Sequence, residues 1–214
     1  MAELRLIGYR FSVYTRVVRM ALIEKGLSAD YVEVDPFRHP VDAILTSHTP
    51  FGRVPVLSQG DFHLYETAAI LRFLDALSDA TPLTPQDPRE VARMQQVIGI
   101  VDSYGYGSLV RSVFSEAVFG PAFGTPGDCE KIAEGLRQAE PVLDALEAIA
   151  AEGLALGTGP LTLGDIHLAP MLSYFDMAPE GRQRLEARSC LSDRFRWVSR
   201  RQSFTETDPR PFTG

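Results

Sequence analysis

The chain has 214 residues, of which 45% are hydrophobic, enough for one large domain or two smaller ones with buried cores. A formal net charge of −7, with no basic run longer than Arg200-Arg201, argues against a nucleic-acid-binding protein. No apolar stretch approaches the ~18 residues of a membrane span, and the first residues do not form a signal peptide. Cys129 and Cys190 stand too far apart for a disulfide framework or a metal-ligand pair, so we expect a cytoplasmic protein.

The N-terminal third of the chain predicts alternating strands and helices. In chain order we expect a strand at residues 4–8, a helix around 18–25 that stops at Gly26, a strand at 31–35, a short helix at 41–45, a hairpin of strands 54–57 and 62–65, and a helix at 67–77. A parallel βαβ unit followed by an antiparallel ββα unit is the thioredoxin arrangement. We therefore predict a thioredoxin-like β-α-β-α-β-β-α domain, of the α/β class, at residues 1–78.

The predicted hairpin carries two unusual features. Pro55 stands at the mouth of its first strand, where it cannot donate a hydrogen bond to the sheet. It suits either a cis proline that holds the backbone of Val54 open to a ligand or an ordinary edge strand, and the stretch alone leaves both open. Thr67, next to the acidic Glu66, is a candidate cap for the following helix.

The remaining residues predict an all-α domain at 89–214, after a proline-rich linker at 79–88. The sequence Asp87-Pro88-Arg89-Glu90 is typical of a helix start, and no strand pattern follows it. We expect long helices at residues 88–115, with a bend or break at Gly105 and Gly107, and at 128–152, with a kink at Pro141.

A capping box begins another helix, which runs to Phe175. Thr162 is the expected cap, Asp165 is its reciprocal partner, and Leu161 and Ile166 are spaced to form a hydrophobic staple. Few charges follow, so we expect this helix at the centre of the second domain. The pattern favours a structural role for Asp165 over a catalytic one.

The turn between the first strand and the first helix is the reactive position of thioredoxin-like domains. Redox members place Cys-x-x-Cys there, whereas this chain has Ser12-Val13-Tyr14-Thr15, so it cannot itself exchange disulfides. A hydroxyl at a helix start could stabilise the thiolate of a ligand. Lowering a thiol pKa from about 8.5 by two units takes roughly 2.7 kcal/mol; a helix terminus supplies about 0.3–2 and a hydrogen bond to a charged group about 1.5–3. The alternative is that Ser12 or Thr15 only caps the helix.

The chain resembles the cytosolic glutathione transferases over nearly its whole length. The motifs that carry the resemblance lie at residues 9–22, 50–57, 65–70, 161–171 and 197–204. The resemblance implies a homodimeric enzyme with glutathione as co-substrate and no metal. The four histidines show no ligand spacing of their own, which agrees with a site that lacks a metal.

The resemblance also implies how glutathione is held. Val54, before a cis Pro55, would pair its backbone with the cysteinyl part, and Arg53 and His39 would face the glycyl carboxylate. Glu66 and Thr67 would bind the γ-glutamyl end, whose ammonium suits a carboxylate and whose carboxylate suits a hydroxyl at a helix start.

Ser12 matches the catalytic serine of the theta-, delta- and zeta-like groups. The tyrosine of the tyrosine groups would fall at Gly8, which leaves Tyr9 and Tyr14 as runners-up for the catalytic role. The prolines often found around the serine are absent, so the resemblance does not assign a subclass.

The second domain should supply the pocket for the other substrate. Asp102 matches an acidic residue that reaches the partner subunit's glutathione in delta-like enzymes, or it is a solvated helix carboxylate. The candidates for lining the pocket are Tyr104, Tyr106, Arg111 and Phe114, each of which could instead be a core residue.

We expect a glutathione transferase in which the glutathione thiolate attacks a small hydrophobic electrophile. One alternative is a glutathione-dependent isomerase, dehalogenase or peroxidase on the same fold. A further alternative is a non-enzymatic glutathione-binding or interaction protein, which the intact Glu66-Thr67 pair argues against.

Overall fold

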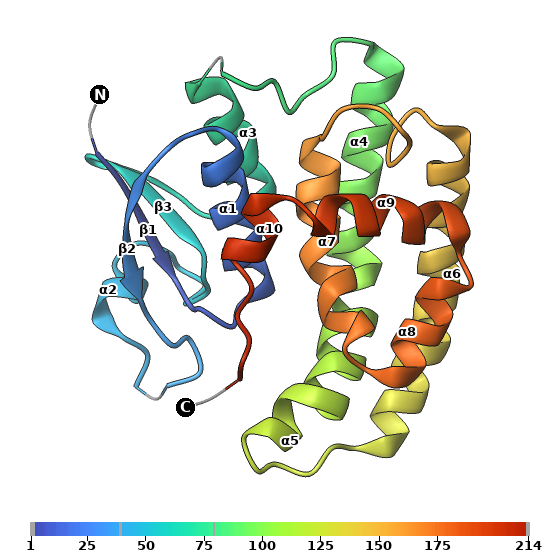
Figure 1. Ribbon diagram of the computed structural model, residues 1–214. Coiled ribbons are helices and arrows are strands. Elements are labelled where there is room, and N and C mark those ends of the chain that lie inside the picture. The colour runs from blue at the N-terminus through green and yellow to red at the C-terminus, as the bar shows by residue number, and fades with distance from the viewer. Residues whose placement is uncertain (1–2, 39, 79, 213–214) are drawn as a thin grey trace. The chain divides into compact units, whose positions relative to one another are not determined.

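The computed structural model describes residues 3–38, 40–78 and 80–212. These form two compact units (Figure 1). We call Met1–Pro82 with Glu206–Pro209 the N-terminal unit, and Leu83–Thr205 with Arg210–Gly214 the helical unit. Within the described residues, no helix is long and apolar enough to cross a membrane.

The N-terminal unit is built on a four-stranded sheet with strand order β2-β1-β3-β4. Its elements are β1 (Leu4–Gly8), α1 (Val13–Glu24), β2 (Ala29–Glu33), α2 (Ala43–Thr46), β3 (Val56–Gln59), β4 (Phe62–Leu64) and α3 (Thr67–Leu77). β1 pairs with β2 in parallel and with β3 antiparallel, and β3 pairs with β4 antiparallel. The predicted thioredoxin-like order is confirmed.

Strand boundaries differ slightly from the prediction. β2 begins and ends two residues earlier than expected, and β3 begins at Val56 because Pro55 cannot donate to the ladder. Side chains alternate between the faces of β1. Ile7, on one face, packs in a buried cluster with Val56 and with Leu45 of α2.

The helical unit contains helices of very different lengths. They are α4 (Pro88–Ile100), η1 (Val101–Phe119), α5 (Gly120–Ala122), α6 (Cys129–Glu152), α7 (Leu163–Asp176), α8 (Pro179–Glu186), α9 (Ser189–Ser199) and α10 (Gln202–Glu206), whose last residue belongs to the N-terminal unit. The predicted all-helical second part of the chain is thus confirmed, and α6 runs on through Pro141.

The long helix predicted over residues 88–115 is present, but only its first part is α-helical. The chain turns π-helical at Val101, before the glycines where we expected a break. π-Helical hydrogen bonds join residues five apart, as between the Gly120 N–H and the Ser115 carbonyl. The four-residue spacing used for prediction therefore does not describe which side chains of η1 share a face.

A buried ion pair completes the predicted capping box of α7. The Thr162 hydroxyl accepts from the Asp165 N–H, and the Asp165 carboxylate accepts from the Thr162 N–H at 2.8 Å, as predicted. The structure adds Arg194 of α9, whose Nε and one terminal nitrogen lie 2.7 and 2.8 Å from the two carboxylate oxygens. Both side chains are buried, so Asp165 holds α7 and α9 together.

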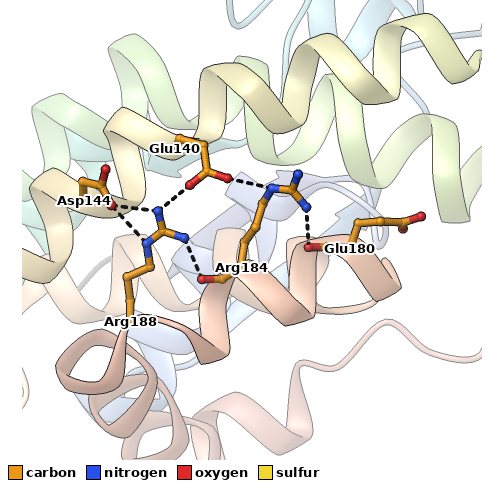
Figure 2. Close-up of polar contacts among 5 residues, drawn as sticks. All are labelled: Glu140, Asp144, Glu180, Arg184 and Arg188. Atoms are coloured by element: carbon orange, nitrogen blue, oxygen red, sulfur yellow. Dashed lines mark hydrogen bonds and ion pairs between the residues drawn. The ribbon is translucent and has the colours of Figure 1, made fainter.

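A second ion-pair network joins α6 to α8 and to the residue that precedes α9 (Figure 2). Arg184 donates to Glu140 at 2.8 Å, and Arg188 donates to Asp144 and also contacts Glu140. The hydrogen bonds that Glu140 accepts from Arg188 and Arg184 lower its pKa below the ordinary 4.5, and the one from Arg188 is the largest cause. On the same helix, Glu147 accepts from two N–H groups in the first turn of α9.

Replacing Asp165 by asparagine should strongly destabilise the protein. The substitution keeps a hydrogen-bond acceptor for the cap but leaves the Arg194 charge buried without its anion, which should cost about 3–5 kcal/mol. Denaturant unfolding of the full chain measures this loss. Asp193→Asn is the control, since its ion pair with Arg196 is exposed and should contribute less than about 1 kcal/mol. Equal stability of the two variants would contradict the role given to Asp165.

Replacing Glu140 by glutamine should have a pH-dependent effect. A carboxylate whose pKa is lowered on folding stabilises the protein above its unfolded pKa and loses that contribution as the pH falls. Glu140→Gln should therefore be less stable than the wild type at neutral pH, by under about 1 kcal/mol because the group is partly exposed. The difference should shrink as the pH falls below 4.5 and vanish only below the lowered pKa of Glu140 in the folded protein. Urea unfolding across pH, with the exposed Glu186→Gln as control, tests this; a difference that grows in acid would refute it.

Candidate functional site

Ser12 stands at the start of α1, where both of its predicted roles meet. It is the N-cap, with extended backbone (φ −73°, ψ 121°), and its Oγ accepts a hydrogen bond from the Thr15 N–H at 3.2 Å. Capping uses a lone pair of the hydroxyl oxygen, whereas donation to a thiolate uses the hydroxyl hydrogen. The two roles left open by the sequence are therefore compatible in one half-buried side chain.

No side chain fits at Gly8, where a catalytic tyrosine would have to stand. A Cβ there would lie 2.4 Å from Thr15 Cγ2 and 2.9 Å from Tyr31 Cε2. Thr15 is itself fully buried, and its Oγ1 accepts from the Tyr9 N–H at 3.2 Å. The close packing of β1 against α1 thus requires glycine at this position.

Tyr9 is poorly suited to ionise. Its ring meets the edges of Phe11 and Phe37, with centroids 5.4 and 6.2 Å apart. Burial raises the pKa of the Tyr9 phenol above its ordinary value, and the carboxylates of Asp35 and Glu33 raise it further. A neutral Tyr9 phenol could still donate a hydrogen bond. The other runner-up, Tyr14, lies half-buried in the first turn of α1.

The Val54–Pro55 peptide bond is cis, one of the two arrangements that the sequence left open. Both residues precede β3, so they lie just outside the part of the strand that pairs with β1. Arg53 is exposed beside them. His39, the other residue expected to face the glycyl carboxylate, lies outside the described residues.

Glu66 has a backbone conformation that its sequence did not reveal. Its φ of 69° lies in the left-handed region, which usually costs a non-glycine residue about 1–3 kcal/mol. It precedes α3 but makes no capping hydrogen bond with its side chain, and it is exposed. Thr67, the first residue of α3, is buried. The Glu66 carboxylate is therefore exposed next to the start of α3 and does not cap it.

The sheet brings these three segments to one edge. β3 runs antiparallel to β1, with Val56 opposite Ile7, so the Val54–Pro55 bond lies next to the end of β1 that leads to Ser12. β3 also runs antiparallel to β4, with Leu57 opposite Leu64, so the end of β4 that leads to Glu66 lies there too. The central position of β3 therefore gathers all three segments.

The candidates in the helical unit do not form one group. Tyr104 and Arg111 are exposed, Tyr106 is half-buried, and Phe114 is only 3% exposed. The Phe114 ring lies 4.3 Å from that of Tyr174, between centroids, so it belongs to an aromatic cluster of the core.

Asp102 has a partner that the sequence did not indicate. Its Oδ1 lies 2.8 Å from Nε2 of His167, a fully buried residue of α7. The two are 65 positions apart, and no local pattern links them. Across the described residues, no three histidine, cysteine or acidic side chains gather as a metal site would need.

Replacing Gly8 by alanine should destabilise the N-terminal unit. The added methyl group must displace Thr15 and the start of α1, at a cost of about 1–3 kcal/mol. Thermal and denaturant unfolding measure the loss. Gly99→Ala in α4 is the matched control, because its Cβ meets open space and should stabilise the helix by about 0.5–1 kcal/mol. A Gly8→Ala protein as stable as the wild type would contradict the tight packing described above.

Comparisons with known proteins agree with this geometry. Models of the glutathione S-transferase N-terminal and C-terminal domains match residues 6–82 and 130–200. A glutathione S-transferase of Silene vulgaris is 30% identical over 203 residues, 92% of each chain, and one of Hyoscyamus muticus is 29% identical over 175 residues, 80% of this chain and 82% of the relative.

Two solved structures are also similar over nearly the whole chain. Glutathione S-transferase III in its apo form superposes with a TM-score of 0.84 at 27% identity, covering 96% of this chain and 95% of that one. The theta-class enzyme of the citrus canker pathogen Xanthomonas axonopodis pv. citri, with glutathione bound, gives 0.81 at 25% identity over 100% of both chains. The chain is therefore a glutathione transferase-like enzyme that belongs to the glutathione S-transferase family.

Proposed function

We propose that the N-terminal unit binds glutathione at the sheet edge where Ser12, the Val54–Pro55 bond and the start of α3 come together. The observation that carries this proposal is the antiparallel pairing of β3 with both β1 and β4, which gathers these segments. The theta-class neighbour, whose structure contains glutathione, supports the choice of ligand.

The charged end of glutathione fits the start of α3. The exposed Glu66 carboxylate attracts the γ-glutamyl ammonium. The first N–H groups of α3 and the Thr67 hydroxyl attract the γ-glutamyl carboxylate, because a helix N-terminus carries a partial positive charge. The strained φ of Glu66 is consistent with such a role, since strain of this kind gathers at ligand-binding sites.

The rest of the tripeptide would lie along the segment before β3. The backbone of Val54, at the cis bond, pairs with the cysteinyl part, and the exposed Arg53 faces the glycyl carboxylate. We propose that His39 faces the same glycyl carboxylate.

Ser12 is our proposed catalytic residue, with Tyr9 and Tyr14 as runners-up. Its hydroxyl oxygen is occupied by the Thr15 N–H, which leaves the hydroxyl hydrogen free to point at a sulfur. Together with the α1 terminus it stabilises the thiolate, which attacks a small hydrophobic electrophile. Isomerisation, dehalogenation and peroxide reduction use the same thiolate and differ in the electrophile.

The helical unit would supply the pocket for that electrophile. We keep residues 1–78 as the glutathione-binding domain and 89–214 as the second-substrate domain. Tyr104, Tyr106 and Arg111 are more open to a ligand than the buried Phe114. We further propose a cytoplasmic homodimer in which Asp102, whose Oδ1 is hydrogen-bonded to His167, reaches the glutathione of the partner.

Substitutions of Ser12 should separate its two roles. Ser12→Ala loses both the cap and the donor, whereas Ser12→Gly costs only a few tenths of a kcal/mol as a cap. If the hydroxyl acts on sulfur, both variants should raise the pKa of bound glutathione by about one to two units. For a thiol pKa that starts at about 6.5, the thiolate fraction and kcat/KM at pH 7 should then fall by about 3- to 25-fold. Thiolate absorbance and a conjugation assay measure this, with the exposed Ser28→Ala as control.

The outcomes distinguish the proposals. A wild-type protein that is not retained on immobilised glutathione would refute the glutathione site. A Ser12→Gly protein with full turnover would remove the donor role and bring Tyr9 or Tyr14 forward.

A further inference from the structure

Arg16 is a buried cation one helical turn after Ser12. It is only 1% exposed and is the largest fully buried side chain among the described residues. Its Nε donates a hydrogen bond to Oγ1 of Thr207, with the two atoms 3.5 Å apart. Thr207 is also 1% exposed, so this contact lies in the interior.

The partner of Arg16 comes from the far end of the chain. Thr207 is 191 positions later, in the segment Glu206–Pro209, which belongs to the N-terminal unit although the residues on both sides of it belong to the helical unit. Four residues near the C-terminus are therefore part of the unit for which we propose glutathione binding.

The geometry of α1 connects this contact to Ser12. Residues four apart share one face of an α-helix, and long side chains point back toward its N-terminus. The Arg16 N–H donates to the Ser12 carbonyl at 3.0 Å, and the Thr15 N–H donates to the Ser12 hydroxyl. Fixing Arg16 thus fixes the turn that orients the Ser12 side chain.

A second buried cation allows a comparison along the same helix. Lys25 follows α1 and donates to Asp75 at 3.0 Å and to the Thr81 carbonyl at 2.7 Å. Both partners lie within residues 1–82 and far along the helix from Ser12. The two ends of α1 therefore have different partners, and the C-terminal segment contacts the end near Ser12.

We propose that Thr207 and Arg16 are positioning residues for Ser12, so that the Glu206–Pro209 segment is needed for full activation of the glutathione thiol. This inference rests on the proposed function of Ser12. It concerns the orientation of the hydroxyl and not the binding of glutathione, so the two effects can be measured apart.

The first test uses the protein without ligand. Thr207→Val removes the acceptor, Thr207→Ser keeps it, and Thr205→Val changes a nearby exposed threonine whose hydroxyl bonds within α10. Hydrogen exchange at the amides of Thr15 and Arg16 should become about tenfold faster in Thr207→Val alone. This corresponds to a fall of about 1.4 kcal/mol in the free energy of local opening. Unchanged exchange there would overturn the inference whether or not the protein binds glutathione.

The second test measures thiol activation. In Thr207→Val the pKa of bound glutathione should rise by about one unit and kcat at pH 7 should fall about threefold, while Kd for glutathione changes less than about twofold. Thr207→Ser should restore both values. Lys25→Met, which removes the buried cation after the far end of α1, should lower stability but leave the thiol pKa unchanged.

These readouts separate the possible failures. A wild type that does not bind glutathione refutes the proposed function, and the exchange test still decides on the anchoring of α1. A Thr207→Val protein with lower stability but a normal thiol pKa gives the segment a purely structural role and overturns the inference.

Discussion

The antiparallel pairing of β3 with both of its neighbours is the constraint on which the proposed site depends. Ile7 opposite Val56 and Leu57 opposite Leu64 fix the register of three strands. A shift of one residue would turn every side chain of β3 to the other face and bury polar groups in the core. The same register holds the ends of three segments at one edge, so the core and the site are stabilised by the same contacts.

Two residues at that edge show local backbone strain or close packing. Glu66 adopts a positive φ, which leaves its carboxylate free of its own helix, and Gly8 leaves room for the buried Thr15. Thr15 in turn accepts from the Tyr9 N–H and donates its own N–H to Ser12. A single chain of contacts therefore leads from the first strand to the hydroxyl that we propose as the thiolate donor.

The helical unit is organised around a different interaction, the buried pair of Asp165 and Arg194. The Asp165 carboxylate accepts hydrogen bonds both from the Thr162 N–H at the start of α7 and from the Arg194 guanidinium of α9. Such a pair contributes little net stability compared with an apolar contact, but removing one partner is costly. It therefore fixes which helices pack together more than it adds stability. The Glu140 network does the same on the surface, with weaker, partly exposed ion pairs (Figure 2).

The sequence alone determined the order of the elements, the capping box of α7 and the position of the reactive turn. These features depend on hydrogen bonds and side-chain spacing within a few residues, which a local pattern records. Tertiary structure alone decided the partners of Asp165, Asp102 and Arg16, which lie 29, 65 and 191 positions away. It also decided the π-helical form of η1 and the strained backbone of Glu66. Such contacts depend on the path of the whole chain. A buried polar group needs a hydrogen-bond partner, and the fold decides which residue lies close enough to provide it.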